Sequence, residues 1–172
     1  YMDRDEAFSK LSRPNANDNV LLLTHIDMDA AGAELLCKWV FKNLTVKHLS
    51  NSKMSQSILD YVKYNAENKE YDMVIIDDIS CSIEVADEID KLKDNMKIVL
   101  LDHHDTAIAL NKYDWALVSS SLLKDSFMVG RYKDISEAHS SGASLMYDYL
   151  NYSGVLKATD FIKEIIHLIA AY

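Results

Sequence analysis

The sequence predicts an α/β fold, a mainly parallel sheet of roughly five strands flanked by helices. Short apolar runs alternate along the chain with longer segments in which apolar residues recur at helical spacing. Runs this short and this continuously apolar are typical of strands that are buried on both faces, as in parallel sheets. Only 4 glycines and 1 proline occur in 172 residues, which disfavours turn-rich all-β folds. The alternation therefore indicates βαβ units with right-handed crossovers.

Five apolar runs are expected to form the strands, at residues 20–24, 46–49, 73–76, 97–101 and 115–118. Helices are expected at residues 30–43, 55–67, 83–92, 140–151 and 157–171. The apolar residues of the helix 30–43 that fall near one face, and that we expect to face the core, are Ala31, Leu35, Leu36, Trp39 and Val40. Residues 1–19 are polar and mixed. We expect them to form an N-terminal segment with a short helix and a turn, followed by one domain over residues 20–172.

The charge balance argues against a protein that wraps long nucleic acid. The chain has 27 acidic and 18 basic residues, which gives a net charge of −9 at pH 7. Proteins that bind a nucleic-acid backbone over a long stretch are usually basic. A short phosphate substrate stays compatible with this charge, because bound divalent cations reverse the sign of the local field.

The sequence shows neither a membrane span nor a disulfide framework. No apolar run approaches the roughly 18 residues that a bilayer-spanning helix needs, and no basic segment followed by an apolar one resembles a secretory signal. Cys37 and Cys81 lack the spacing of a disulfide framework or a zinc site. We expect both to be reduced, small buried thiols in a cytoplasmic protein that has no membrane partner.

Clusters of acids and histidines directly follow three of the expected strands. The clusters are His25-Ile26-Asp27-Met28-Asp29, Asp77-Asp78-Ile79-Ser80 and Asp102-His103-His104-Asp105. The carboxyl ends of parallel strands meet at one edge of a sheet, and ligands of open α/β sheets bind there. We therefore expect the three clusters to converge.

Each cluster alone has an ordinary explanation. Asp27 and Asp29 fit a solvated loop, His25 fits a hydrogen-bonded structural histidine, and Asp77-Asp78 fits an acid pair at a helix start. Together they are harder to explain, because neighbouring carboxylates raise one another's pKa and destabilise the fold unless cations are present. Carboxylates with some imidazole suit manganese, magnesium or iron better than a thiolate-loving metal. The conjunction predicts a two-metal site, in which ions about 3.5–4 Å apart clamp a phosphate and activate a water.

These motifs resemble those of the DHH phosphoesterases. Residues Thr24–Ala30 resemble the first motif, Ile75–Ser80 the second, and Leu101–His104 the motif that gives the family its name. The small residues of Ser140–Ser144, which open an expected helix, resemble the helix start that follows in the family. The resemblance spans about residues 20–172 in motif order and spacing, and it implies that residues 20–172 are the DHH catalytic domain.

The resemblance implies a hydrolase that uses two Mn²⁺ ions, with Mg²⁺ or Co²⁺ as substitutes. The His25-x-Asp27-x-Asp29 spacing and the Asp78-Ile79-Ser80 motif are most similar to the nano-RNase and exonuclease branches. They imply hydrolysis of phosphodiester bonds in short oligonucleotides or small nucleotides. The alternative enzymes are a pyrophosphatase or exopolyphosphatase and a nucleoside-bisphosphate phosphatase. An alternative from another class is an inactive regulatory or nucleotide-binding module. Whether the protein forms a homodimer is also left open. A phosphatase with a phosphorylated aspartate would explain Asp27-x-Asp29 but not Asp102-His103-His104.

The metal ligands that the resemblance implies are His25, Asp27, Asp29, Asp78 and His103. In this arrangement Asp27 and Asp29 each hold one ion, and Asp78 bridges the two. His25 is expected to act as a ligand or as a contact to the phosphate. Asp77 is expected to hold no metal, because Asp78 aligns better with the single essential acid of the second motif.

The catalytic residues that the resemblance implies are His104 and Asp102. His104 is expected to reach the substrate phosphate, together with Ser141 and Gly142, and Asp102 to orient a neighbouring histidine. The family also has a fourth motif, whose Asp completes the metal site, and a smaller C-terminal substrate-binding domain. Neither occurs within the 172 residues, so we expect a truncated chain with an incomplete site, and whether it is active as it stands is left open.

Overall fold

The computed structural model describes residues 2–50, 52–129, 139–157 and 159–170, apart from the side chains of Met28, Asp29, His167, Ile169 and Ala170. The strands within these residues are β1 (Asn19–Thr24), β2 (Asn43–His48), β3 (Met73–Asp77), β4 (Lys97–Asp102) and β5 (Ala116–Val118). The helices are α1 (Arg4–Phe8), α2 (Met28–Val40), α3 (Met54–Asn68), α4 (Ile83–Asp90), α5 (Gly142–Tyr152) and α6 (Asp160–Ala170), with the 3-10 helices η1 (Lys93–Asn95) and η2 (Asp105–Lys112). None of the described helices is long and apolar enough to cross a membrane.

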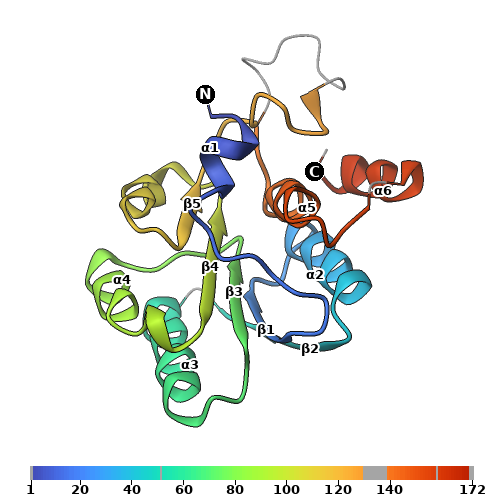
Figure 1. The fold of residues 1–172 in the computed structure, drawn as a ribbon. Helices are drawn as coiled ribbons and strands as arrows, with labels where there is room; N and C mark the ends of the chain where they lie inside the picture. The colour runs from blue at the N-terminus through green and yellow to red at the C-terminus, as the bar shows by residue number, and fades with distance from the viewer. Residues whose placement is uncertain (1, 51, 130–138, 158, 171–172) are drawn as a thin grey trace.

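The strands form one parallel sheet in the order β2-β1-β3-β4-β5, which confirms the predicted fold class. Figure 1 shows the sheet between two layers of helices, with α3 and α4 on one side and α2, α5 and α6 on the other. The strand order reverses between β1 and β3, because β2 lies on one side of β1 and β3 on the other. Ligands of open α/β sheets bind outside the strand ends at such a reversal.

Alternate residues of the central strands face two different hydrophobic cores. Leu22 and Ile75 pack with residues of α1, α2 and α5, whereas Leu23 and Ile76 pack with residues of α3, α4 and η2. All four are fully buried, and burial of such a side chain contributes about 1.5–3 kcal/mol. The apolar runs of the sequence thus give a sheet that is covered on both faces and that holds its strand ends in place.

Helix α2 corrects one prediction, because part of its expected inner face is exposed. Leu36 and Val40 are buried as predicted, but Ala31 is exposed, and Leu35 and Trp39 are 46% and 63% exposed. The apolar residues of this helix cover a wider arc than one contact needs, and only one stripe of them faces the sheet. Leu35 and Trp39 instead line an apolar groove of about 210 Å³ between α2 and α6.

The edge strand β2 and the 3-10 helix η2 were the elements that the sequence described least well. The run 46–49 predicted only part of β2, whose residues are half-buried or exposed because the strand lies at the edge of the sheet. Helix η2 was not predicted, although it directly follows the Asp-His-His motif. Its first residues therefore lie beside the carboxyl edge of the sheet.

Candidate metal centre and active site

The corner between β1 and α2 presents His25 and Asp27 at the carboxyl edge of the sheet. Asp27 is the N-cap of α2, and its Oδ1 accepts a hydrogen bond of 2.7 Å from the N–H of Ala30. Its Oδ2 lies 3.6 Å from Nδ1 of His25. Burial acts to raise the pKa of Asp27, but the hydrogen bonds with Ala30 and with the carboxyl group of Asp78, and the nearby His25, together lower it. The corner thus favours a charged carboxylate at the sheet edge.

The corner after β3 places Asp78 in an unusual backbone conformation. Asp77 ends the strand and is fully buried, and Asp78 is only 5% exposed. Asp78 has a φ of 65°, in the left-handed region, which costs a residue other than glycine about 1 kcal/mol. Its N–H donates a hydrogen bond of 3.0 Å to the carbonyl of Leu101 in β4. Strained residues of this kind persist where the surroundings hold them, and they cluster at functional sites.

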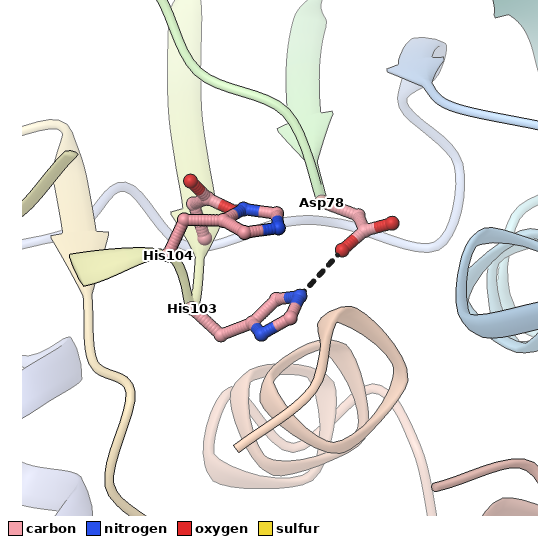
Figure 2. Close-up of side chains that lie close together, drawn as sticks. Asp78, His103 and His104 are labelled. Atoms are coloured by element: carbon pink, nitrogen blue, oxygen red, sulfur yellow. Dashed lines mark hydrogen bonds and ion pairs between the residues drawn. The ribbon is translucent and has the colours of Figure 1, made fainter. Parts of the chain in front are cut away.

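The corner after β4 supplies two histidines with different partners. Nε2 of His103 lies 2.7 Å from Oδ1 of Asp78, and Nδ1 of His104 lies 2.7 Å from Oδ1 of Asp102. The two imidazole rings are 4.2 Å apart between centroids. Figure 2 shows His103 facing Asp78 across the first of these hydrogen bonds, with the His104 ring beside it. Asp102 is fully buried, so it can hold His104 in a single orientation.

The three corners meet under one cleft. Ligand atoms of Asp78, Asp102, His103 and His104 all lie within 4.8 Å of one another. The carboxyl group of Asp27 lies near that of Asp78, which contributes to the lowered pKa of Asp27, and both residues line the same cleft. The cleft has a volume of about 380 Å³ and is lined by His25, Asp27, Met54, Asp78, Ile79, Ser80, His104 and Thr106. The predicted convergence is therefore observed for these residues, whereas Asp29 lies in the first turn of α2 and its side chain is outside the described part of the structure.

This donor set fits a divalent cation. Carboxylate oxygens and imidazole nitrogens are the ligands that ions such as manganese prefer. Oδ2 of Asp102 is buried and has no hydrogen-bond partner among the described residues, and leaving such an atom unsatisfied is costly. A cation would relieve both this cost and the repulsion between the neighbouring carboxylates.

The start of α5 lies against the same corner. Ser141 is its N-cap, and Oγ of Ser141 accepts a hydrogen bond of 3.0 Å from the N–H of Ser144. Oγ of Ser144 in turn accepts one of 2.9 Å from the N–H of Ser141, which completes a capping box. Gly142 is buried beside Asp77 and Asp78. The contact of Ser141 and Gly142 with a substrate stays a prediction, since neither residue is among those that line the cleft.

Four cleft residues were not predicted from the sequence as site residues. Ile79 and Ser80 lie inside the second motif and Thr106 just beyond the third, so their proximity to the motifs could have signalled them. Met54 begins α3 and belongs to no motif; only the folded chain brings it to the cleft. Cys37 is buried as predicted, whereas Cys81 is only half-buried. Cys81 does not line the cleft, and burial raises the pKa of its thiol to about 12. A neutral thiol is consistent with the structural role expected for it.

Among known proteins, this chain is similar to oligoribonuclease NrnB of Bacillus subtilis (strain 168). The two sequences are 25% identical over 153 residues, which cover 88% of this chain and 35% of that protein. The chain therefore spans about a third of the length of this relative. No protein-family model matches the sequence.

Among solved structures, the chain is similar to an uncharacterized protein from Helicobacter pylori G27. The TM-score is 0.60 at 20% sequence identity, over 78% of this chain and 36% of the other. At this identity the likeness supports the fold alone. The similarity to NrnB and the placement of the motifs support a distant relationship between this chain and an oligoribonuclease, in line with the resemblance to the DHH phosphoesterases.

Proposed function

We propose that this chain carries the catalytic domain of a manganese-dependent phosphoesterase. The reaction is hydrolysis of phosphodiester bonds in short oligonucleotides or small nucleotides, with the scissile phosphate held at the carboxyl edge of the sheet. The observation that carries the proposal is the gathering of Asp78, Asp102, His103 and His104 beside Asp27 at the reversal of strand order. The similarity to an oligoribonuclease supports the same reaction class.

Asp78 is the proposed bridge between two cations. Asp78 directly follows β3, the strand next to both β1 and β4, and its carboxyl group interacts with Asp27 on one side and with Nε2 of His103 on the other. Asp27 and Asp29 would each hold one ion in this proposal, and His103 would be a further ligand. When bound, two divalent cations would lower the pKa of a water molecule and neutralise charge on the phosphate.

His104 is the proposed contact to the substrate phosphate. Nδ1 of His104 is hydrogen-bonded to Asp102. Because His104 lines the cleft, its second ring nitrogen, Nε2, is the one proposed to contact the phosphate. Asp102 is buried, so it fixes the ring orientation without itself being near solvent. His25, which also lines the cleft, is a proposed ligand or phosphate contact.

A small substrate suits the electrostatics better than a long nucleic acid. The chain has a net charge of −9, and the cleft is lined by acids, histidines and small or apolar residues. Such a surface does not attract a long polyanion by itself. Binding then depends on the cations and on a few contacts to one phosphate and its flanking groups.

A substrate panel tests the proposed function. The full-length protein is assayed with Mn²⁺, Mg²⁺ or Co²⁺, and with a chelator, against short RNA, a nucleoside bisphosphate, a cyclic dinucleotide and pyrophosphate. We expect Mn²⁺-dependent hydrolysis, fastest with short RNA. A preference for pyrophosphate or for the nucleoside bisphosphate would select one of the alternative phosphatase functions. Nucleotide binding without hydrolysis of any substrate would overturn the proposal in favour of a regulatory module.

A further inference from the structure

We infer that Gly142 is a positioning residue that sets the place of Asp78 in the candidate metal centre. This role rests on the proposed function, but the contact itself exists in the metal-free protein. A methyl group at position 142 would lie 2.8 Å from Cβ of Asp78 and 2.9 Å from Oδ2 of Asp77. Contacts this short between carbon atoms do not occur in folded proteins, where ordinary contact begins at 3.4 Å. The absence of a side chain at Gly142 is thus what lets α5 begin against the Asp77-Asp78 corner.

Neither helix propensity nor backbone conformation calls for a glycine at this position. Gly142 is the first residue of α5, where alanine would be the better helix former. Its φ is not among the positive values, unlike that of Gly154 at 81°. The close approach to Asp77 and Asp78 is the remaining physical reason for a glycine.

Helix α5 cannot easily withdraw to make room for a side chain. The Ser141–Ser144 capping box fixes where the helix starts. Leu145 and Met146, in the next turn, are buried in the core between α5 and the sheet. The atom nearest to the added methyl group is Cβ of Asp78, which is joined directly to the backbone and cannot rotate away. A side chain at position 142 would therefore displace Asp78 rather than the helix, by about half an ångström or more.

Asp78 is sensitive to such a displacement. Its left-handed backbone is held by the hydrogen bond to Leu101, and its carboxylate meets His103 at 2.7 Å. Catalytic groups need to be held within about 0.5 Å of their working geometry. A shift of this size would misplace the proposed bridging ligand while leaving the rest of the cleft in place.

A double-mutant cycle tests the contact without metal or activity. Gly142→Ala should lower Tm by several degrees in the wild-type background. Asp78→Gly removes Cβ and Cγ, the Asp78 atoms within 3.2 Å of the added methyl group. Gly142→Ala should therefore lower Tm much less in the Asp78→Gly background than in the wild-type background. If Gly142→Ala is too unstable to fold in the wild-type background, the double variant should still fold. An equal loss of Tm in both backgrounds would overturn the inference.

Mn²⁺ titration tests the positioning role, with Gly154→Ala as the matched control. Alanine at position 154 is strained by φ of 81° but meets nothing within 4 Å, so it lowers stability without touching the site. We expect Gly142→Ala to weaken Mn²⁺ binding at least about tenfold and to lower kcat about a hundredfold with a smaller change in KM. Gly154→Ala should keep both. Equal Mn²⁺ affinity for Gly142→Ala and wild type would overturn the positioning role. A wild-type protein that binds no Mn²⁺ would instead refute the proposed function. The contact between position 142 and Asp78 would then be tested by the Tm measurements of the double-mutant cycle alone.

Discussion

The two edges of the sheet treat their acidic residues differently. At the amino edge, Asp18 pairs with Lys97 at 2.8 Å, and Oδ2 of Asp72 accepts a hydrogen bond of 2.8 Å from the N–H of Asn19. At the carboxyl edge, the carboxyl group of Asp78 lies 2.7 Å from Nε2 of His103 and near the carboxyl group of Asp27, and the start of α5 lies against Asp78. The amino edge neutralises its acids with a lysine and backbone groups, as a structural ion pair does.

The difference between the two edges indicates which acidic residues have a functional role. Acids paired with lysine stabilise a fold modestly and call for no further explanation. Acids that lie close to one another and to histidines, one of them in a left-handed backbone conformation, repel one another where they are charged. A divalent cation at the carboxyl edge would relieve that repulsion.

The largest effect is expected from Asp78→Ala in the full-length protein. Loss of the proposed bridge should remove both the activated water and the clamp on the phosphate, so kcat should fall at least about a thousandfold. Asp77→Ala should lower kcat much less, because Asp77 is assigned no metal. Asp18→Asn, at the amino edge, should leave kcat unchanged. If Asp77→Ala abolished activity and Asp78→Ala did not, the second motif would be assigned one residue out of register.

A smaller loss is expected from His104→Gln. The change removes the proposed contact to the phosphate but no metal ligand, so kcat should fall about a hundredfold while Mn²⁺ affinity stays close to that of the wild type. The matched control is His48→Gln, because His48 ends β2 at the same edge but pairs with Glu34 at 2.8 Å. Equal losses for both variants would mean that any histidine at this edge matters and would remove the special role of His104.

Asp148 provides a buried acid that lies at neither edge. Asp148 lies in α5 and is 1% exposed, and this burial raises its pKa to about 7. The negative charge of Asp125 adds to the rise in pKa, whereas hydrogen bonds from Ser126 and Phe127 and the nearby Arg4 oppose it. The folded state therefore holds a proton that the unfolded state releases near its ordinary pKa of 3.8. Asp148 therefore contributes its full stabilisation to the folded state below pH 3.8. As pH rises to about 7, this contribution to the unfolding free energy is lost, and the loss is on the order of 4 kcal/mol.

Asp148→Asn should remove this pH dependence. The difference in unfolding free energy between variant and wild type, measured by urea denaturation across this pH range, should favour the variant increasingly as pH rises towards 7 and then level off. Ser126→Ala keeps the carboxyl group and serves as the control. A difference that stays constant with pH would show that Asp148 titrates at its ordinary value in the folded protein.

The smallest effect is expected at the amino edge, from Lys97→Met. Lys97 and Asp18 have side chains that are 38% and 13% exposed, so the pair is partly screened by solvent. The unfolding free energy should fall by about 1 kcal/mol or less, and Mn²⁺-dependent activity should not change. A loss of activity comparable to that of Asp78→Ala would erase the contrast between the edges.

Much of the fold could be predicted because the strands are continuous apolar runs. Burial on both faces leaves a strong local signal in β1, β3 and β4, and parallel strands bring their carboxyl ends to one edge. The placement of Asp27, Asp78 and His103 near one another followed from these two facts. The edge strand β2 was described less well, because within the described residues it pairs with a strand on one side only and its residues need not be apolar.

Other features depend on packing between distant segments and leave no local pattern. The left-handed backbone of Asp78 is accompanied by a hydrogen bond from its N–H to Leu101 of β4, which is far away in sequence. Met54 reaches the cleft only because α3 packs on the sheet, and Leu35 and Trp39 are exposed because Leu36 and Val40 already fill the contact with the core. A helical pattern alone does not tell which of two apolar stripes is buried.

Anomalous diffraction from crystals of the full-length protein soaked in Mn²⁺ tests whether the carboxyl edge of the sheet holds two metal ions. Two manganese peaks about 3.5–4 Å apart are predicted in the cleft at the carboxyl edge. Carboxylate oxygens of Asp27 and Asp78 and Nε2 of His103 should lie within about 2.0–2.3 Å of an ion, with Asp78 shared between the two. Manganese bound at Cys81 or at the acids of the amino edge, with none in the cleft, would contradict the account.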